Sequence, residues 1–236
     1  MVDVCIVGNT AMTHLLMQFP VHQLAMAPYV AASGAALDFK AREIDLHTAP
    51  GTYVHILPCV GGFVGADHVA MILASEMDRT DRVTLGIDIG TNTEIALARP
   101  GTTFLAAVSC ASGPAFEGAH ISDGMRAASG AIEGVTLTES QVQLRTIDDA
   151  PAIGLCGSGI VDAVSELHRW HVINSHGRFD RKNSRVREGR RGPEFLLVPD
   201  NRSGSQRDVV ISQEDINEIQ LAKGAIRAGL DVLLET

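Results

Sequence analysis

The stretch V-T-L-G-I-D-I-G-T-N-T-E-I-A-L-A at residues 83–98 decides the fold of this chain. An apolar run enters a short polar turn that contains Gly90, and a second apolar run leaves it. This pattern is typical of a β-hairpin that cradles phosphate, because glycine lets the backbone turn sharply and approach a ligand. In such a hairpin the turn residues 91–93 offer hydrogen-bond donors, and Asp88 at the end of the first strand reaches a hydrated Mg²⁺. An ordinary hairpin with a polar turn fits the same spacing.

A second glycine cluster, G-L-C-G-S-G-I-V-D-A-V, follows at residues 154–164 and leads into a helical pattern. Apolar residues recur at helical spacing from Ile160 to Leu167, so the Gly-Ser-Gly of residues 157–159 opens a helix. The free N–H groups and the positive dipole end of a helix favour an anion at that point. The alternative is a tightly packed helix start, in which the glycines let the backbone approach a neighbouring strand. Two such loops in one chain favour a nucleotide-binding protein.

Further blocks of the chain extend this pattern. They are G-N-T-A-M-T-H-L-L (8–16), D-I-G-T-N-T-E (88–94), S-C-A-S-G-P-A-F-E-G-A-H-I (109–121), G-M-R-A (124–127), C-G-S-G-I-V-D-A (156–163) and Q-L-A-K-G-A-I-R-A-G (220–229). In content and order these blocks resemble the actin, sugar kinase and heat-shock chaperone ATPase superfamily, and within it the ATP-dependent reductive activators of corrinoid proteins. The resemblance implies an α/β fold of actin-like (ribonuclease H-like) ATPase lobes, with mixed sheets flanked by helices and nucleotide in the cleft.

The resemblance also implies a function, which is to return an inactive cobalt(II) corrinoid to cobalt(I). In the family, an N-terminal iron–sulfur domain passes electrons to the corrinoid protein of a methyltransferase system, as in methylamine metabolism. ATP binding and hydrolysis by a domain of this type reshape the complex so that this uphill transfer can occur. The implied cofactors are therefore ATP and Mg²⁺, with an iron–sulfur cluster in a domain outside this sequence, and the implied partner is the corrinoid protein.

Individual residues take their implied roles from the same resemblance. Asp88 would hold Mg²⁺ through water. The second phosphate loop is matched by Gly90, Thr91, Asn92 and Thr93, and the adenosine-side loop by Gly157, Ser158 and Gly159. The pair that brackets ribose and adenine is resembled by Gln220 and Lys223. The last two residues are spaced i, i+3, which places them on one helix face. Glu117, near the turn at Gly113-Pro114, is a candidate to position water or Mg²⁺, with an exposed or capping glutamate as the structural alternative.

The chain departs from the family pattern at both ends. Relatives carry a first phosphate loop before the block at residues 8–16, and a second glycine-rich adenosine segment is expected after the last helix. We therefore expect an internal or C-terminal-region fragment that is incomplete at both ends. Residues 1–81 would form the remainder of the N-terminal ATPase lobe, and residues 82–236 the C-terminal lobe with a basic loop and hairpin at about 174–211. We expect this piece alone not to turn over ATP.

Local patterns predict the remaining elements. Strands are expected at residues 2–7, 54–60, 194–198 and 209–211, and helices at residues 10–18 and about 66–77. Asn9 fits the N-cap of the first helix. Ser212 with Asp215 forms a start similar to a capping box for a helix that continues toward the C-terminus.

The composition indicates a cytoplasmic globular domain. The 236 residues are 45% hydrophobic but only 4% aromatic, which predicts a core of aliphatic and small side chains. We expect neither a signal peptide nor a membrane helix, because no apolar run reaches the roughly 20 residues that a bilayer span needs. Four widely spaced cysteines, Cys5, Cys59, Cys110 and Cys156, predict buried thiols in a reducing compartment. A metal or redox role is the alternative for the last two, which adjoin the predicted loops.

The net charge of −9 argues against nucleic acid as the main partner. The segment at residues 178–191 is instead rich in basic side chains and has the sequence R-F-D-R-K-N-S-R-V-R-E-G-R-R. We expect a solvated loop that leaves a helix and enters a hairpin, with a docking surface for an acidic partner protein as the alternative.

Two further functions stay open beside the corrinoid activator. One is a small-molecule kinase of the same superfamily, and the other is a docking module that binds a corrinoid protein without hydrolysing ATP. Exposed apolar surface on the first 81 residues would also favour self-association into a homodimer.

Overall fold

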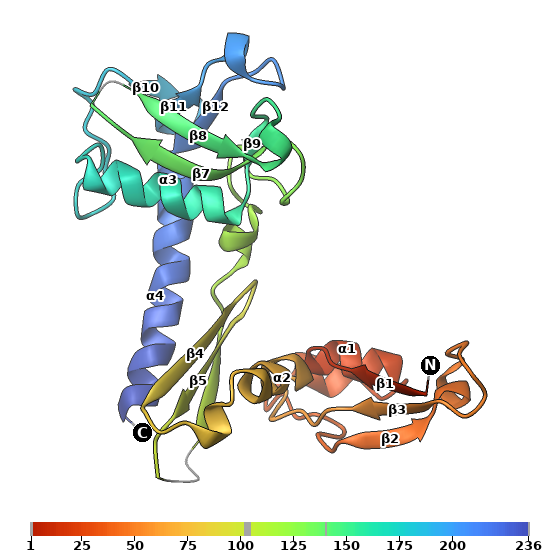
Figure 1. Cartoon of the computed structure of the whole chain (residues 1–236). Helices are drawn as coiled ribbons and strands as arrows, with labels where there is room; N and C mark the ends of the chain where they lie inside the picture. The colour runs from red at the N-terminus through yellow and green to blue at the C-terminus, as the bar shows by residue number, and fades with distance from the viewer. Residues whose placement is uncertain (1, 102–104, 140, 236) are drawn as a thin grey trace. The chain divides into compact units, whose positions relative to one another are not determined.

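The computed structural model describes residues 2–101, 105–139 and 141–235, which form two compact units (Figure 1). Unit 1 comprises Met1–Asp88, Glu94–Ser109 and Gly229–Thr236. Unit 2 comprises Ile89–Thr93 and Cys110–Ala228. Among the described residues, no helix combines the length and the apolar composition that crossing a bilayer requires.

The first sheet of unit 1 has the strand order β1 (Asp3–Ile6), β3 (Tyr53–Ile56), β2 (Leu37–Lys40). β1 pairs parallel with β3, and β2 pairs antiparallel with β3. One face of this sheet is apolar and contributes to a small core of Ala41, Val54 and Ile56, against which Val4, Ile6, Met17, Leu37 and Phe39 pack. Because side chains alternate along a strand, the other face carries the polar residues.

Helix α1 (Thr10–Leu16) begins where the sequence predicts, because the Asn9 side chain accepts a hydrogen bond of 2.9 Å from the backbone N–H of Met12. Other predicted elements are shorter than expected. The strand predicted at residues 54–60 ends at Ile56, before Pro58, whose missing N–H cannot continue a ladder. The helix predicted at residues 66–77 is α2 (Ala66–Ala74), which ends before Glu76, a residue with φ of 53°.

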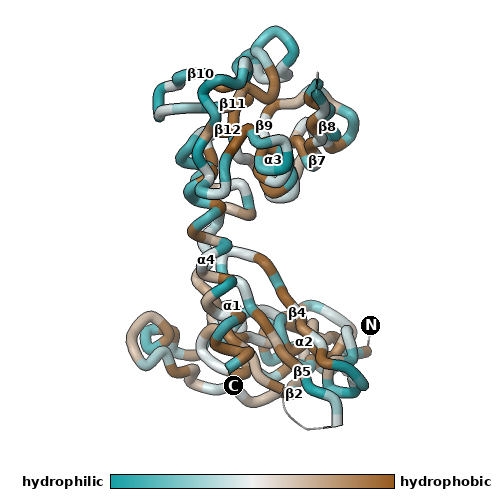
Figure 2. Tube along the Cα trace, turned by 90° about the vertical axis from the view of Figure 1, so that its left-hand side faces the viewer, coloured by the Kyte–Doolittle hydropathy of each residue, from teal (hydrophilic) through white to brown (hydrophobic). Residues whose placement is uncertain are grey.

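The predicted hairpin is present as β4 (Thr84–Ile89) and β5 (Thr93–Ala98), and β6 (Leu105–Cys110) completes a sheet in the order β4-β5-β6. Figure 2 shows that both hairpin strands are largely apolar. β5 is buried, and its Ala96 and Ala98 belong to a core cluster with Ile72 and Met77. The hairpin is therefore held by packing along β5, the central strand of its sheet.

Unit 2 contains two further sheets. The first has the order β8 (Val142–Thr146), β7 (Ala131–Leu137), β9 (Gly154–Leu155), and the second has the order β10 (Val186–Gly189), β11 (Gly192–Val198), β12 (Val209–Ser212). Helix α3 (Gly157–Arg169) lies along β7 (Figure 1), and helix α4 (Gln213–Glu235) begins directly after β12. A shared core that includes Ile132, Leu155, Ile160, Leu167, Phe195, Ile211 and Ile216 joins both sheets to both helices.

The antiparallel pairing of β11 with β12 confirms the two strands predicted at residues 194–198 and 209–211. The sequence patterns do not predict β2, β6, β7, β8, β9 or β10. β7 contains Gly134, and glycine weakens the propensity to form a strand. A side chain at position 134 would contact Arg145 of the neighbouring β8.

Three of the seven basic residues in the stretch 178–191, Arg181, Arg187 and Arg191, form ion pairs with acidic side chains. Arg187 contacts Glu194 at 2.9 Å and Asp208 at 2.6 Å, and Arg191 contacts Glu214 at 3.3 Å. The hydrogen bond from Arg187 holds the pKa of Asp208 below its ordinary value. These ion pairs fit the solvated-hairpin interpretation at the three arginines that form them.

The start of α4 confirms the predicted capping arrangement. Asp215, only 1% exposed, accepts a hydrogen bond of 2.8 Å from the N–H of Ser212, and its own N–H donates to the Ser212 hydroxyl at 3.2 Å. The other carboxylate oxygen accepts from the N–H and the hydroxyl of Ser122, at 2.7 and 3.1 Å. One buried carboxylate thus fixes both the helix start and a loop far away in sequence.

We expect Asp215→Ala to lower the free energy of unfolding by about 3 kcal/mol, because it leaves buried N–H and hydroxyl donors without an acceptor. Urea unfolding followed by circular dichroism measures this loss. Glu214→Ala is the matched control, since it removes an exposed carboxylate from the same helix turn and should change stability by less than about 0.5 kcal/mol. Equal effects of the two substitutions would contradict the role given to Asp215.

Candidate functional site

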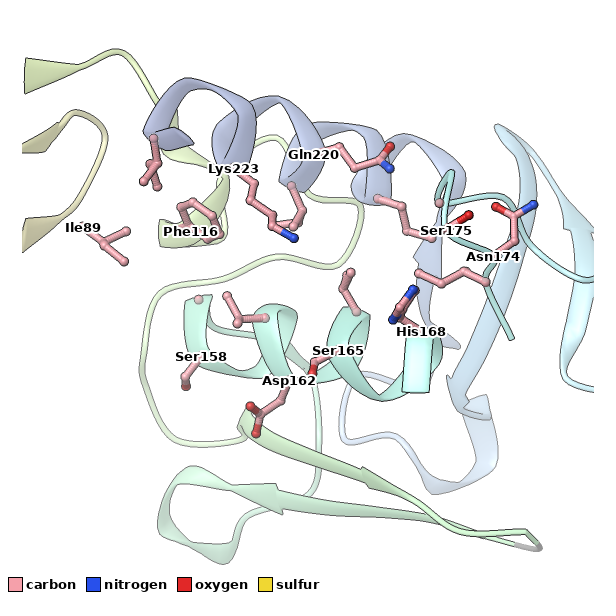
Figure 3. Close-up of a pocket in the computed structure, with 18 residues that line it drawn as sticks. Ile89, Phe116, Ser158, Asp162, Ser165, His168, Asn174, Ser175, Gln220 and Lys223 are labelled. Carbon is pink, nitrogen blue, oxygen red and sulfur yellow. The ribbon is translucent and has the colours of Figure 1, made fainter. Parts of the chain in front are cut away.

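A hollow of about 830 Å³ lies in unit 2 between α3 and α4 (Figure 3). Its lining residues are Ile89, Phe116, Gly157, Ser158, Val161, Asp162, Val164, Ser165, His168, Ile173, Asn174, Ser175, Gly177, Ile216, Ile219, Gln220, Lys223 and Ile226. A volume of this size, with mostly apolar walls and a few polar groups, is typical of a site for a small organic ligand.

Four of the residues that the sequence analysis selects line this hollow: Gly157 and Ser158 from α3, and Gln220 and Lys223 from α4. Figure 3 shows that Lys223 and Gln220 extend from α4, whereas the side chains of Ser158 and Asp162 point away from α4. The polar side chains that α4 presents to the hollow are therefore an ammonium and an amide.

The glycines at the start of α3 have a packing role. A Cβ atom at Gly157 would lie 1.8 Å from the Phe116 carbonyl oxygen, and a Cβ atom at Gly159 would lie 2.0 Å from the Ile132 carbonyl oxygen. Neither position can hold a side chain without moving backbone, so the close-approach interpretation of these glycines is supported. Cys156, the N-cap residue, makes no side-chain capping hydrogen bond. The first turn of α3 thus combines tight packing with N–H groups that no capping side chain satisfies.

The turn between β4 and β5 is tied to the segment at residues 110–117. The Thr91 hydroxyl donates to the Glu117 carboxylate at 2.8 Å, which brings two of the predicted site residues together. The hydroxyl of Thr93, a fully buried residue, lies 2.8 Å from that of Ser112, and the Ser112 hydroxyl also donates to the Gly90 carbonyl oxygen at 3.1 Å. Thr93 therefore shapes the turn from within, whereas Thr91 lies on its exposed side.

None of Gly90, Thr91, Asn92, Thr93 and Glu117 lines the hollow between α3 and α4. Ile89, which directly precedes the turn, does. Gly159 does not line the hollow either. The structure thus groups the other predicted site residues of unit 2 into two sets, one at the β4–β5 turn and one at the hollow.

Asp88 lies in unit 1, where it belongs to an electrostatically coupled group. Burial lowers the pKa of His68, and the negative charges of Asp88 and Asp67 oppose that shift. Burial raises the pKa of Glu94, the hydrogen bond from Ser109 lowers it, and the charges of Asp67 and Asp88 raise it further. Asp88 is itself exposed, so its carboxylate is open to solvent.

His68, Glu94 and Ser109 are not among the site residues predicted from the sequence. Glu94 is the last residue of the block at residues 88–94, and its place in that block is the sequence feature that could have marked it as a site residue. Nothing in the sequence marks His68, which is 1% exposed and whose two ring nitrogens have no hydrogen-bond partner within the described part of the chain. Across residues 2–101, 105–139 and 141–235, no three His, Cys, Asp or Glu side chains are arranged to hold a metal ion.

The prediction of four buried cysteines is correct for Cys110 and Cys156 and wrong for Cys5, which is exposed. Cys59 is half-buried. Cys5 is exposed because it lies on the outward face of β1, where side chains alternate with the core residues Val4 and Ile6.

Comparisons with known proteins give matches along the whole chain. Residues 82–236 match the family model described as the C-terminal domain of RACo, the ASKHA domain, and residues 1–80 match the RACo middle region. A solved structure titled "Reductive activator for corrinoid,iron-sulfur protein" superposes with a TM-score of 0.88 at 38% identity, covering 99% of this chain and 38% of that one.

Two curated relatives agree with this result. The "Corrinoid activation enzyme RamQ" of Eubacterium limosum is 35% identical over 97% of this chain and 39% of its own length. The "[Co(II) methylated amine-specific corrinoid protein] reductase" of Methanosarcina barkeri is 28% identical over 72% of this chain and 32% of its own length. The chain thus spans less than two fifths of each relative. These matches confirm the predicted resemblance and fold class: this chain belongs to the RACo family of corrinoid activators and comprises a middle region and a C-terminal ASKHA domain.

Proposed function

We propose that this chain is the nucleotide-binding part of a reductive activator that returns a cobalt(II) corrinoid to cobalt(I). The observation that carries the proposal is the match of residues 82–236 to an ASKHA domain whose α3 and α4 enclose a ligand-sized hollow. The printed names of the relatives, a corrinoid activation enzyme and a reductase of a methylated-amine-specific corrinoid protein, support the substrate class. The electrons would come from the iron–sulfur domain that the family resemblance implies.

The hollow in unit 2 suits the adenosine end of ATP. Ile216 and Ile219 of α4 and Val164 of α3 provide apolar walls of the kind on which a purine ring packs. Gln220 and Lys223 extend from α4 and offer an amide and a cation to ribose hydroxyls and phosphate oxygens. The nucleotide's negative charge would complement Lys223.

The β4–β5 turn suits a phosphate group. Its exposed residues Thr91 and Asn92 present a hydroxyl and an amide, and Gly90 keeps the backbone of the turn accessible. The hydrogen bond from Thr91 to Glu117 holds that carboxylate at the turn, where it would orient an attacking water. Asp88, two positions before Gly90, is a single exposed carboxylate, and this fits Mg²⁺, which keeps most of its waters and takes one or two carboxylates. The ion would neutralise phosphate charge.

The role of Lys223 is tested by calorimetric titration of Mg-ATP and of a non-hydrolysable analogue into the chain. We expect Lys223→Ala to raise Kd about tenfold, which corresponds to about 1.4 kcal/mol, because a cation is lost from the hollow. Lys182→Ala is the control, since it removes the same charge from an exposed loop of unit 2. If the two variants bind ATP as the unmodified chain does, the hollow is not the nucleotide site.

The role of Asp88 is tested by comparing ATP affinity in excess Mg²⁺ and in EDTA. We expect the unmodified chain to bind more tightly with Mg²⁺, and Asp88→Asn to lose that difference while keeping its fold, because the side chain is exposed. Asp81→Asn, which removes another exposed carboxylate from unit 1, should retain the Mg²⁺ effect. A persistent Mg²⁺ effect in Asp88→Asn would assign the metal to other groups.

The partner is tested with a corrinoid protein of a methylamine methyltransferase system, held in the cobalt(II) state. We expect Mg-ATP to strengthen its complex with this chain, as measured by sedimentation velocity, and Lys223→Ala to lose the nucleotide effect. A complex that forms equally well without nucleotide would favour the docking-module alternative. Transfer of phosphate to a small metabolite would favour the kinase alternative.

A further inference from the structure

The outward face of the first sheet of unit 1 brings a thiol, an imidazole and a carboxylate into one row. In the β1–β3 ladder Cys5 is paired with His55, and in the β3–β2 ladder Asp38 is paired with the same His55. Side chains of directly paired residues lie on the same face of a sheet, and neighbouring strands are about 4.8 Å apart. Cys5, His55 and Asp38 are therefore adjacent, although 33 and 50 positions separate Asp38 and His55 from Cys5 in sequence.

The hydrogen bond from His55 to Asp38 fixes the state of the imidazole. The His55 Nδ1 lies 2.7 Å from the Asp38 Oδ1, and an ionised carboxylate accepts but cannot donate. Nδ1 therefore carries a hydrogen, and in the neutral ring Nε2 is left as the proton acceptor. The side chains of His55 and Asp38 are 43% and 73% exposed, and Cys5 is exposed as well, so a small reagent can reach the row.

We propose that Cys5, His55 and Asp38 form a reactive-thiol site that undergoes exchange with small neutral or cationic disulfides. The three residues have the roles of a nucleophile, the base beside it, and a third group that orients the base. A metal site is the other function that such residues serve, but no three of the described side chains are arranged to hold a metal ion. The proposal is independent of the nucleotide function.

The surroundings of the row define the class of disulfide. A surface hollow of about 530 Å³ is lined by Asp3, Val4, Cys5, Asp38, Tyr53 and His55, and the two aspartates are its charged groups. The nearby Lys40 ammonium lies over the Tyr53 ring, 3.0 Å from its centroid, and donates to the Gly51 carbonyl oxygen at 3.2 Å. The acidic lining favours a cationic or neutral reagent and repels an anionic one.

The exchange step balances without a further oxidant. His55 Nε2 accepts the thiol proton of Cys5, and the Cys5 sulfur attacks one sulfur of the disulfide. A new S–S bond forms as the S–S bond of the reagent breaks, and the departing thiolate takes the proton from His55. Cys5 is thereby oxidised to a mixed disulfide, and half of the reagent is reduced to a free thiol.

The test is the rate at which cystamine, a cationic disulfide, modifies each cysteine of the full chain, resolved by peptide mass spectrometry. We expect Cys5 to react first among the four. His55→Gln should slow modification of Cys5 at pH 7 by roughly tenfold or more, and Asp38→Asn by a smaller factor, because base assistance is lost or misdirected. His22→Gln is the control, since it changes an exposed histidine of the same unit that lies outside the sheet.

The pH profile separates base assistance from simple exposure. An unassisted thiol has a pKa near 8.5, so the rate in His55→Gln should rise roughly tenfold between pH 6.5 and 7.5, whereas the unmodified chain should show a much shallower rise. Identical profiles, or equal rates at pH 7, would overturn the proposal and leave Cys5 an ordinary exposed thiol. The substrate class is tested with an anionic disulfide, dithiobis(nitrobenzoate). For each reagent, the rate at Cys5 in the folded chain is divided by the rate in the urea-unfolded chain. A larger ratio for dithiobis(nitrobenzoate) than for cystamine would overturn the proposed class of disulfide.

Discussion

The close approach of α3 to its neighbours is the constraint on which unit 2 depends. At Gly157 the helix start meets the Phe116 carbonyl, and at Gly159 it meets the Ile132 carbonyl of β7, each at a distance that excludes a Cβ atom. This contact seats Ile160 and Leu167 of α3 in the core that joins both sheets to α4. The hollow between α3 and α4 is thus bounded on one side by a helix that cannot shift outward without breaking the packing of the unit.

The buried polar side chains of the two units differ in whether their hydrogen bonds are satisfied. In unit 2 the buried Thr93 and Asp215 have their hydrogen bonds satisfied, so they stabilise a turn and a helix start. In unit 1 the buried His68 has no partner for its ring within the described residues, a situation that costs roughly 1–3 kcal/mol of stability. The negative charge of Asp88, the carboxylate that the family resemblance assigns to Mg²⁺, opposes the lowering of the His68 pKa by burial.

Elements whose determinants are local in sequence could be predicted. The start of α1 rests on Asn9, the start of α4 on Ser212 and Asp215, and the β4–β5 hairpin on a glycine turn between apolar runs. Element ends were less accurate, because Pro58 and the left-handed Glu76 stop a strand and a helix that hydrophobic periodicity alone would continue. β7 and β8 escaped prediction because their stability comes from pairing with each other and from packing against α3, neither of which a single strand displays.

The sequence by itself determined the family and the α/β class, because the blocks that carry the resemblance can be read in content and order along the chain. It also located the β4–β5 turn and the glycine-rich start of α3, since each is a motif of residues within a few positions of one another. Only the tertiary structure decided that Thr91 contacts Glu117, that His68 is buried without a hydrogen-bond partner among the described residues, and that Cys5, His55 and Asp38 share one row. The physical reason is strand register: hydrogen bonds between backbones set which distant residues face each other, and a shift of one position would move every side chain of a strand to the opposite face. The expectation of four buried cysteines failed at Cys5 for this reason, because an outward and an inward position in a short strand have similar neighbours in sequence.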